Sequence, residues 1–129
     1  MPESIADHED LARILRSSSH FSASGVKAAA FMPAKDGRTS VIRHGSEPRH
    51  SLWSVGAQVL GTPVRHGAAI CGTSAIRRER LDVLADEPPL RHANIVGWPT
   101  NADAELQKAQ QKELALAIAA KSTLVRLDE

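Results

Sequence analysis

The residues of this sequence best suited to chemistry are histidines that directly follow arginines. Four of the six histidines do so, in the pairs Arg43-His44, Arg49-His50, Arg65-His66 and Arg91-His92. With eleven arginines among 129 residues, chance predicts fewer than one such pair. A guanidinium binds phosphate or carboxylate oxygens through parallel N–H groups, and an imidazole gains and loses a proton near neutral pH. The pairs therefore predict a surface that binds an oxyanion and can move a proton beside it.

The place of each pair relative to the predicted strands decides how it could act. Adjacent residues of a strand face opposite sides, so an Arg-His pair can serve one ligand only at a strand end. Two pairs meet this condition, at the end of 39–43 and at the start of 92–98, and we therefore take His44 and His92 as the candidate catalytic residues. The candidate ligand-binding residues are Arg43, Arg91, Arg49, His50, Arg65 and His66. The alternative is that the pairs are solvated loop and edge residues.

One pair also belongs to a short motif. The segment Thr39-Ser-Val-Ile-Arg43-His44-Gly45 is an apolar strand followed by Arg-His-Gly, and it resembles the strand-then-RHG motif of the histidine phosphatase family. The resemblance implies an α/β domain in which His44 is phosphorylated, neighbouring arginines hold the phosphate and His92 is the second family histidine. It covers only this segment, and Arg65-His66-Gly67 repeats the tripeptide without an apolar strand before it.

Other sites are not supported by any motif. The sequence contains no HxxxH, HExxH or CxxC spacing and neither GxGxxG nor GxxxxGK[ST], so we expect no metal site and no cofactor. The single cysteine, Cys71, cannot form an internal disulfide and lies in an apolar run, which predicts a small buried hydrophobic residue. The N-terminal segment has no apolar stretch of a signal peptide, and no run is long enough to span a membrane. We therefore expect a soluble, cytoplasmic protein without membrane association.

The overall charge argues against nucleic acid as the main partner. The formal net charge is +1 and only 3% of the residues are aromatic, whereas nucleic-acid-binding proteins usually carry a clear basic excess or aromatic stacking platforms. The basic run 77–80 could contact a nucleic-acid backbone, but such runs are usually solvated. A protein partner or a small anionic ligand is the better expectation, and the sequence leaves the oligomeric state open.

Hydrophobic periodicity predicts the elements that must position these residues. Helices are expected over 7–16, from a cap at or near Ser46 or Glu47 with Pro48 at an early helical position to Gly61, and from Asn101 or Asp103 to about Lys121. Strands are expected over 26–32, 39–43, 68–72, 81–85 and 92–98, the first two forming a hairpin around Asp36-Gly37. Residues 73–80 could form a helical turn or a loop, and 122–127 could prolong the last helix or form a strand.

These elements predict an α+β fold over residues 1–129 as a single domain. Because the connections include a hairpin, we expect a mixed or antiparallel sheet of about four to six strands, with about three helices packed mainly on one face.

Two functions fit this pattern. The first is a small non-catalytic binding or accessory protein that recognises an anionic ligand or partner through the Arg-His pairs. The alternative is a metal-independent phosphate-directed enzyme, a ribonuclease or phosphohydrolase, in which histidine is the acid or base and arginine stabilises charge. The enzyme requires at least two histidines within about 7 Å of each other and of an arginine, lining one pocket.

Overall fold

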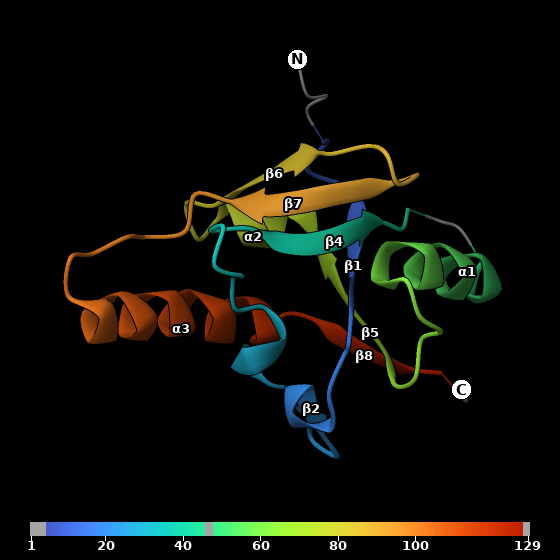
Figure 1. Ribbon diagram of the computed structural model, residues 1–129, viewed down its shortest axis with the longest axis horizontal. Helices are drawn as coiled ribbons and strands as arrows, with labels where there is room; N and C mark the ends of the chain where they lie inside the picture. The colour runs from blue at the N-terminus through green and yellow to red at the C-terminus, as the bar shows by residue number, and fades with distance from the viewer. Residues whose placement is uncertain (1–4, 46–47, 128–129) are drawn as a thin grey trace.

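An antiparallel sheet organises the chain (Figure 1). The computed structural model describes residues 5–45 and 48–127. Its six-stranded sheet has the order β6-β7-β4-β1-β5-β8, and each neighbouring pair is antiparallel. The strands are β1 (Asp10–Ile14), β4 (Thr39–Arg43), β5 (Gly67–Gly72), β6 (Asp82–Ala85), β7 (His92–Val96) and β8 (Thr123–Arg126). A small second sheet pairs β2 (Phe21–Ser22) with β3 (Gly25–Val26). The predicted α+β class is confirmed.

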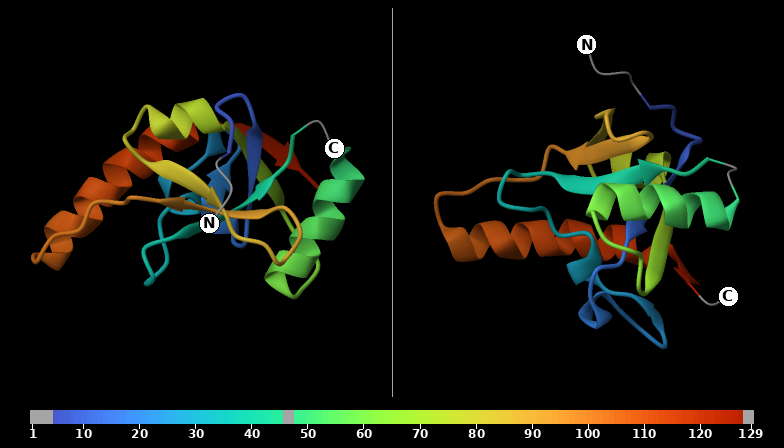
Figure 2. Two further views of the ribbon diagram at one scale, coloured as in Figure 1. Left: turned by 90° about the horizontal axis from the view of Figure 1, so that it is seen from above. Right: turned by 45° about the vertical axis from the view of Figure 1, so that its right-hand side comes forward.

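The helices divide between the two faces of the large sheet (Figure 2). They are α1 (Arg49–Leu60), α2 (Thr73–Arg77) and α3 (Ala104–Ala120), with the short 3-10 turns η1 (Ser18–His20) and η2 (Ala28–Ala30). Residues of α2, α3 and η2 join the larger apolar cluster, which contains Val41, Ile95 and Ile118. Helix α1 packs on the opposite face, where Leu52 joins the smaller cluster with Ile42. Two of the three helices thus share one face.

Helix α1 covers only part of its face. Within the described residues, the buried members of its cluster lie on β1, β4, β5, α1 and the loop before β5, and none lies on β6 or β7. Ser40 pairs with Asn94, and Ile42 pairs with His92. Because side chains alternate along a strand, Ser40, His92 and Asn94 lie on the same face as Ile42. Beside α1, this face therefore presents polar groups in place of an apolar surface.

The helix predicted over 7–16 is wrong, because residues 10–14 form β1. This strand lies inside the sheet between β4 and β5. Leu11 is buried in the larger cluster, and Ala12 and Ile14 are buried in the smaller one. A strand covered on both faces carries apolar residues without alternation, so its spacing resembled that of a helix.

The hairpin predicted over 26–43 is also wrong, although 39–43 is a strand. Strand β4 pairs with β1 and β7, while Val26 pairs with Phe21 in the small sheet. Between them, η2 and Phe31 are buried in the cluster that includes Ala115 and Ile118 of α3. Three consecutive alanines have weak strand propensity, and burial beneath α3 accounts for the compact turn.

Several boundaries agree with the sequence-based expectations. Asp103 caps α3 by accepting hydrogen bonds from the N–H groups of Glu105 and Leu106. Gly61 ends α1 in the left-handed conformation, with φ of 77°. The ambiguous segments resolve as α2 and β8. The expected cap residues of α1, Ser46 and Glu47, lie outside the described residues, and Pro48 is the N-cap and not a residue within the first turn.

Cys71 is buried as expected, and its thiol is predicted to react slowly. Its exposed fraction is 3%, and burial followed by the negative charge of Asp10 raises its pKa from 9.0 to about 11. The thiolate fraction near neutral pH is then about 100-fold below that of the unfolded chain, so alkylation by iodoacetamide should be slower by about that factor. Stability should fall as pH rises from 9.0 to about 11, because only the unfolded thiol ionises there. Equal alkylation rates in native and unfolded protein would contradict this placement.

Candidate functional site

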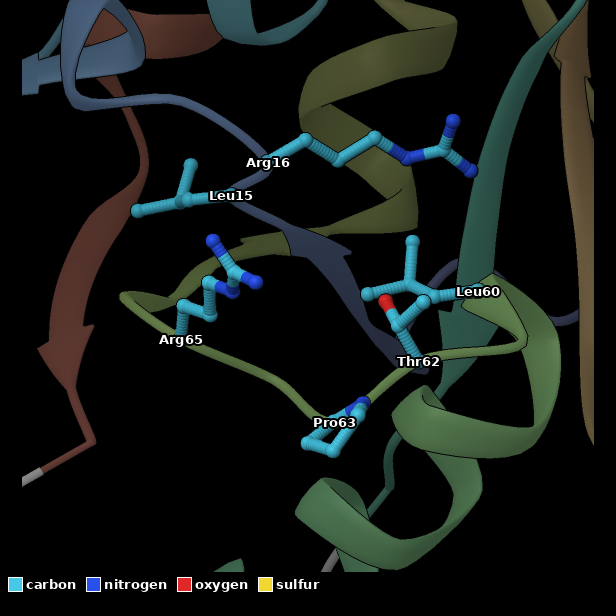
Figure 3. A pocket seen from close by; sticks show the side chains of 6 residues that line it. All are labelled: Leu15, Arg16, Leu60, Thr62, Pro63 and Arg65. Carbon is cyan, nitrogen blue, oxygen red and sulfur yellow. The ribbon is translucent and has the colours of Figure 1, made fainter.

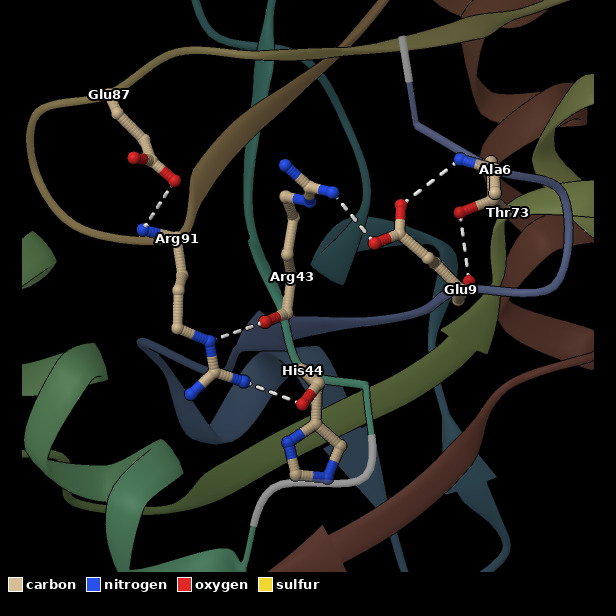
Figure 4. Close-up of polar contacts among 7 residues, drawn as sticks. All are labelled: Ala6, Glu9, Arg43, His44, Thr73, Glu87 and Arg91. Atoms are coloured by element: carbon tan, nitrogen blue, oxygen red, sulfur yellow. Dashed lines mark hydrogen bonds and ion pairs between the residues drawn. The ribbon is translucent and has the colours of Figure 1, made fainter. Parts of the chain in front are cut away.

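Arg43 and Arg91 lie together at the end of β4, where they bind atoms of the chain itself (Figure 4). The guanidinium of Arg43 donates to Glu9 Oε1 at 2.7 Å. Arg91 Nε donates to the carbonyl oxygen of Arg43 at 2.7 Å, and Arg91 Nη2 donates to that of His44. The first and last Arg-His pairs therefore meet in space, but these guanidinium contacts are structural.

The backbone of Arg91 also fixes the start of β7. Its φ is 66°, in the left-handed region that costs a non-glycine residue about 1 kcal/mol. Its N–H donates to Glu87 Oε1 at 3.1 Å, and its carbonyl accepts from the N–H of Arg43 at 2.8 Å. These contacts fix the backbone conformation immediately before His92.

His92 belongs to a polar network on the sheet face that α1 leaves open. Its Nε2 lies 2.6 Å from Ser40 Oγ, and its Nδ1 lies 3.0 Å from the carbonyl oxygen of Asp86. The carboxylate of Asp86 is also close, with Oδ2 at 3.5 Å from the same Nδ1. Asn94 Nδ2 donates to this carboxylate at 2.8 Å. The side chain of His92 is only 12% exposed, so both ring nitrogens have defined partners.

The other two Arg-His pairs lie elsewhere. Arg49 and His50 begin α1, with His50 exposed. Arg65 and His66 precede β5, and both line a hollow with Phe21 and Arg126. His66 stacks near Phe21, with ring centroids 5.5 Å apart. The four pairs thus do not converge on one ligand site.

A different set of arginines surrounds the His92 network. A hollow of about 310 Å³ lies over Ser40, Asn94 and His92. Its remaining lining residues are Arg13, Arg16, Met32, Ala34, Asp36, Arg38 and Asp86. The sequence analysis singled out only His92 among these residues. For Arg13, Ser40 and Asn94, the sequence offered one signal, which is a polar residue within an otherwise apolar segment.

Two further spaces share lining residues with this hollow. A second hollow of about 260 Å³ is lined by Leu15, Arg16, Leu60, Thr62, Pro63 and Arg65 (Figure 3). A narrow space between them shares Arg13, Arg16 and Ser40 with the first hollow and Arg16 and Leu60 with the second. We refer to these three neighbouring spaces, which share lining residues, as the sheet-face groove. Arg65, one of the sequence candidates, lines the end opposite His92.

The side chain of Arg13 connects β1 to β4 and to η2. Strands β1 and β4 pair only at Leu11 with Arg43 and at Ala12 with Ile42. Beyond that point, Arg13 Nη1 donates to the carbonyl oxygen of Ser40 at 2.8 Å, and Arg13 Nε donates to that of Ala30 at 2.7 Å. Burial, and to a smaller extent Arg16, lowers the pKa of Arg13 to about 10, which still leaves the guanidinium charged at neutral pH.

The positive charge of this region also acts on a neighbouring histidine. The pKa of His20 is lowered by burial first, and then by the charges of Arg13, Arg16 and His66. Burial disfavours a charge of either sign, so only the smaller contributions of Arg13, Arg16 and His66 indicate positive potential at His20. Two of these groups, Arg13 and Arg16, also line the hollow of about 310 Å³.

Among residues 5–45 and 48–127, no group of three or more His, Cys, Asp or Glu is placed to hold a metal ion. No helix in these two ranges has the length and apolar character needed to cross a bilayer.

The histidine phosphatase resemblance is not supported by the fold or by known proteins. The resemblance implies an α/β domain, whereas the six-stranded sheet is antiparallel throughout. Within the described chain, His92 is the only histidine that lines the hollow of about 310 Å³. Comparison of the chain with protein-family models, curated proteins and solved structures finds no match.

Proposed function

We propose that the chain binds a small organic anion in the sheet-face groove. The observation that carries this proposal is that Arg13, Arg16 and Arg38 line one hollow with Ser40 and His92. Guanidiniums bind carboxylate and phosphate oxygens by charge-assisted hydrogen bonds. A hollow of about 310 Å³ is at the lower end of the range for small-molecule sites.

The three arginines have different tasks in this proposal. Arg13 already donates to two backbone carbonyls, so it contributes positive potential more than direct contacts. Arg16 and Arg38 are exposed, and their side chains can move to meet a ligand. Arg16 also lines the second hollow, so it can contact an anion at either end of the groove.

The phosphate-directed enzyme of the sequence analysis is less well supported. The condition set for that enzyme was two histidines in one pocket, and His92 alone lines this hollow within the described residues. The hollow carries three arginines against Asp36 and Asp86, an excess that suits an anion of low charge. A monocarboxylate, or one oxygen-rich end of a larger molecule, is the ligand class that we favour.

The binding proposal predicts that butyrate stabilises the protein and that this effect depends on Arg16. At a ligand concentration ten times the Kd, stability should rise by about 1.4 kcal/mol, measured by thermal unfolding against sodium chloride at equal ionic strength. Arg16→Ala should weaken butyrate binding roughly tenfold, because it removes a charge-assisted contact. The matched control is Arg78→Ala, which removes an exposed arginine next to α2. Equal butyrate affinity in both variants, or equal stabilisation by chloride, would refute the proposal.

A further inference from the structure

The hydrogen bonds around His92 define where its proton lies. A carbonyl oxygen can only accept a hydrogen bond, so the contact of 3.0 Å with the carbonyl of Asp86 places a proton on His92 Nδ1. In a neutral imidazole the other nitrogen then carries a lone pair. Ser40 must therefore donate its hydroxyl proton to His92 Nε2, across 2.6 Å. This is the arrangement of a serine whose proton is ready to transfer to a base.

The sheet brings these groups together from distant parts of the sequence. Ser40 and His92 are 52 residues apart, and they lie diagonally on the neighbouring strands β4 and β7. Asp86 follows β6, the next strand of the sheet. Its carboxylate is fixed by Asn94 Nδ2 at 2.8 Å and lies 3.5 Å from His92 Nδ1. A positive charge formed on the imidazole would thus have a carboxylate beside it.

The residues that line the hollow distinguish the group of Ser40, His92 and Asp86 from a hydrogen bond with a purely structural role. Ser40, His92 and Asp86 all line the space that Arg16 and Arg38 also line. A bound carbonyl group can therefore lie near a nucleophile and near guanidiniums that stabilise a developing oxyanion. Ester cleavage develops one negative charge, which fits the excess of one arginine over the two aspartates.

We infer that the protein hydrolyses small carboxylic esters, with Ser40 as nucleophile, His92 as general base and acid, and Asp86 as the residue that positions His92. The inference rests on the proposed function, because the same groove must bind the acid portion of the ester. Ser40 Oγ attacks the carbonyl carbon and forms the new C–O bond as its proton passes to His92 Nε2. The tetrahedral oxyanion faces the guanidiniums, and its collapse breaks the bond to the alcohol, which leaves with the proton from His92.

The second half of the reaction restores the serine. Water attacks the acyl-Ser40 carbonyl while His92 Nε2 accepts one of its protons. Collapse of this second intermediate breaks the bond to Ser40 Oγ, which regains the proton from His92. The net reaction consumes one ester and one water and releases one acid and one alcohol, with no oxidant or metal.

The first test is covalent labelling of the full chain with a fluorophosphonate probe, followed by peptide mass spectrometry. Wild-type protein should carry the probe on Ser40, because a fluorophosphonate reacts with a serine activated by a neighbouring base. Ser54→Ala, which changes an exposed serine of α1, should label equally. If Ser40 stays unmodified while butyrate still binds, the hydrolase is refuted and anion binding stands. If Ser40 is modified but butyrate fails to bind, only the proposal of anion binding is refuted.

The second test measures hydrolysis of p-nitrophenyl butyrate. Ser40→Ala and His92→Gln should each lower kcat/KM at least about 100-fold, with Ser54→Ala unchanged. Asp86→Asn should lower kcat about tenfold with little change in KM, because it removes the negative charge beside the imidazolium that forms after binding, while the backbone carbonyl that orients His92 remains. Thermal unfolding of each variant checks that it is folded. A folded Ser40→Ala protein that keeps the wild-type rate would overturn the inference.

Discussion

Replacement of Gly67 by alanine is expected to lower the free energy of unfolding by at least about 3 kcal/mol. Gly67 begins β5 with φ of +137°, a conformation that L side chains rarely adopt. An added Cβ would lie 2.1 Å from the carbonyl oxygen of Val125 and 2.9 Å from Cα of Arg126. Both neighbours are backbone atoms of β8, so no side-chain rotation can relieve the overlap, and β8 would have to separate from β5.

A second glycine isolates the steric part of this effect. Gly61 also has a positive φ, +77°, but no atom lies within 4 Å of the Cβ that alanine would add. Gly61→Ala should therefore cost only about 1 kcal/mol of conformational strain. Thermal unfolding should show Gly67→Ala melting roughly 10 °C or more below wild type, with Gly61→Ala shifted by a few degrees. Equal shifts for the two variants would contradict the close approach of β8 to Gly67.

The helices and strands whose signals are local could be predicted from the sequence. Helix α3 combines an apolar stripe with the cap at Asp103, and α1 ends at a glycine. Both features act within a few residues of the chain, so neighbouring sequence determines them. Strand β4 was equally clear, because β-branched residues dominate it.

The partners of each strand could not be predicted in the same way. Strand β1 lies between β4 and β5, although η1, β2, β3 and η2 separate it from β4 along the chain. Its identity depends on being covered by two apolar clusters on opposite faces. Residues 7–16 contain no signal that apolar clusters will cover both faces of the strand, so the same pattern fits an amphipathic helix and a central strand.

The candidate site was predicted only in part, for a related reason. His92 was identified because a histidine at a strand end suggests chemistry, whereas Ser40 was overlooked as an ordinary residue of a strand. The link between them arises from the pairing of β4 with β7. Arg43 and Arg91 had the right residue type, but their guanidiniums bind Glu9 and backbone carbonyls. Residue type indicates what a side chain can bind, and the fold determines whether a ligand or the chain itself binds it.

Arg13→Ala is expected to lower the free energy of unfolding by about 2–4 kcal/mol, an unusually large effect for a charged residue. Arg13 replaces the backbone pairing that β1 and β4 lose beyond Ala12, and its guanidinium joins β4 to η2. Alanine would leave the carbonyl oxygens of Ser40 and Ala30 without this donor. Arg13→Lys should lose about half as much stability, because one ammonium cannot match the two-pronged geometry of a guanidinium. Urea unfolding of the variants measures these differences.

The comparison with Arg16 separates folding from binding within the same groove. Arg16 is exposed, so Arg16→Ala should change stability by no more than about 0.5 kcal/mol while weakening butyrate binding. Arg13→Ala should weaken both, because the carbonyl that Arg13 holds belongs to Ser40 and its loss frees the strand that carries the nucleophile. If Arg13→Ala is as stable as Arg16→Ala, the guanidinium does not brace the two strands. The groove would then owe its shape to the apolar contacts of α1 and η2 alone.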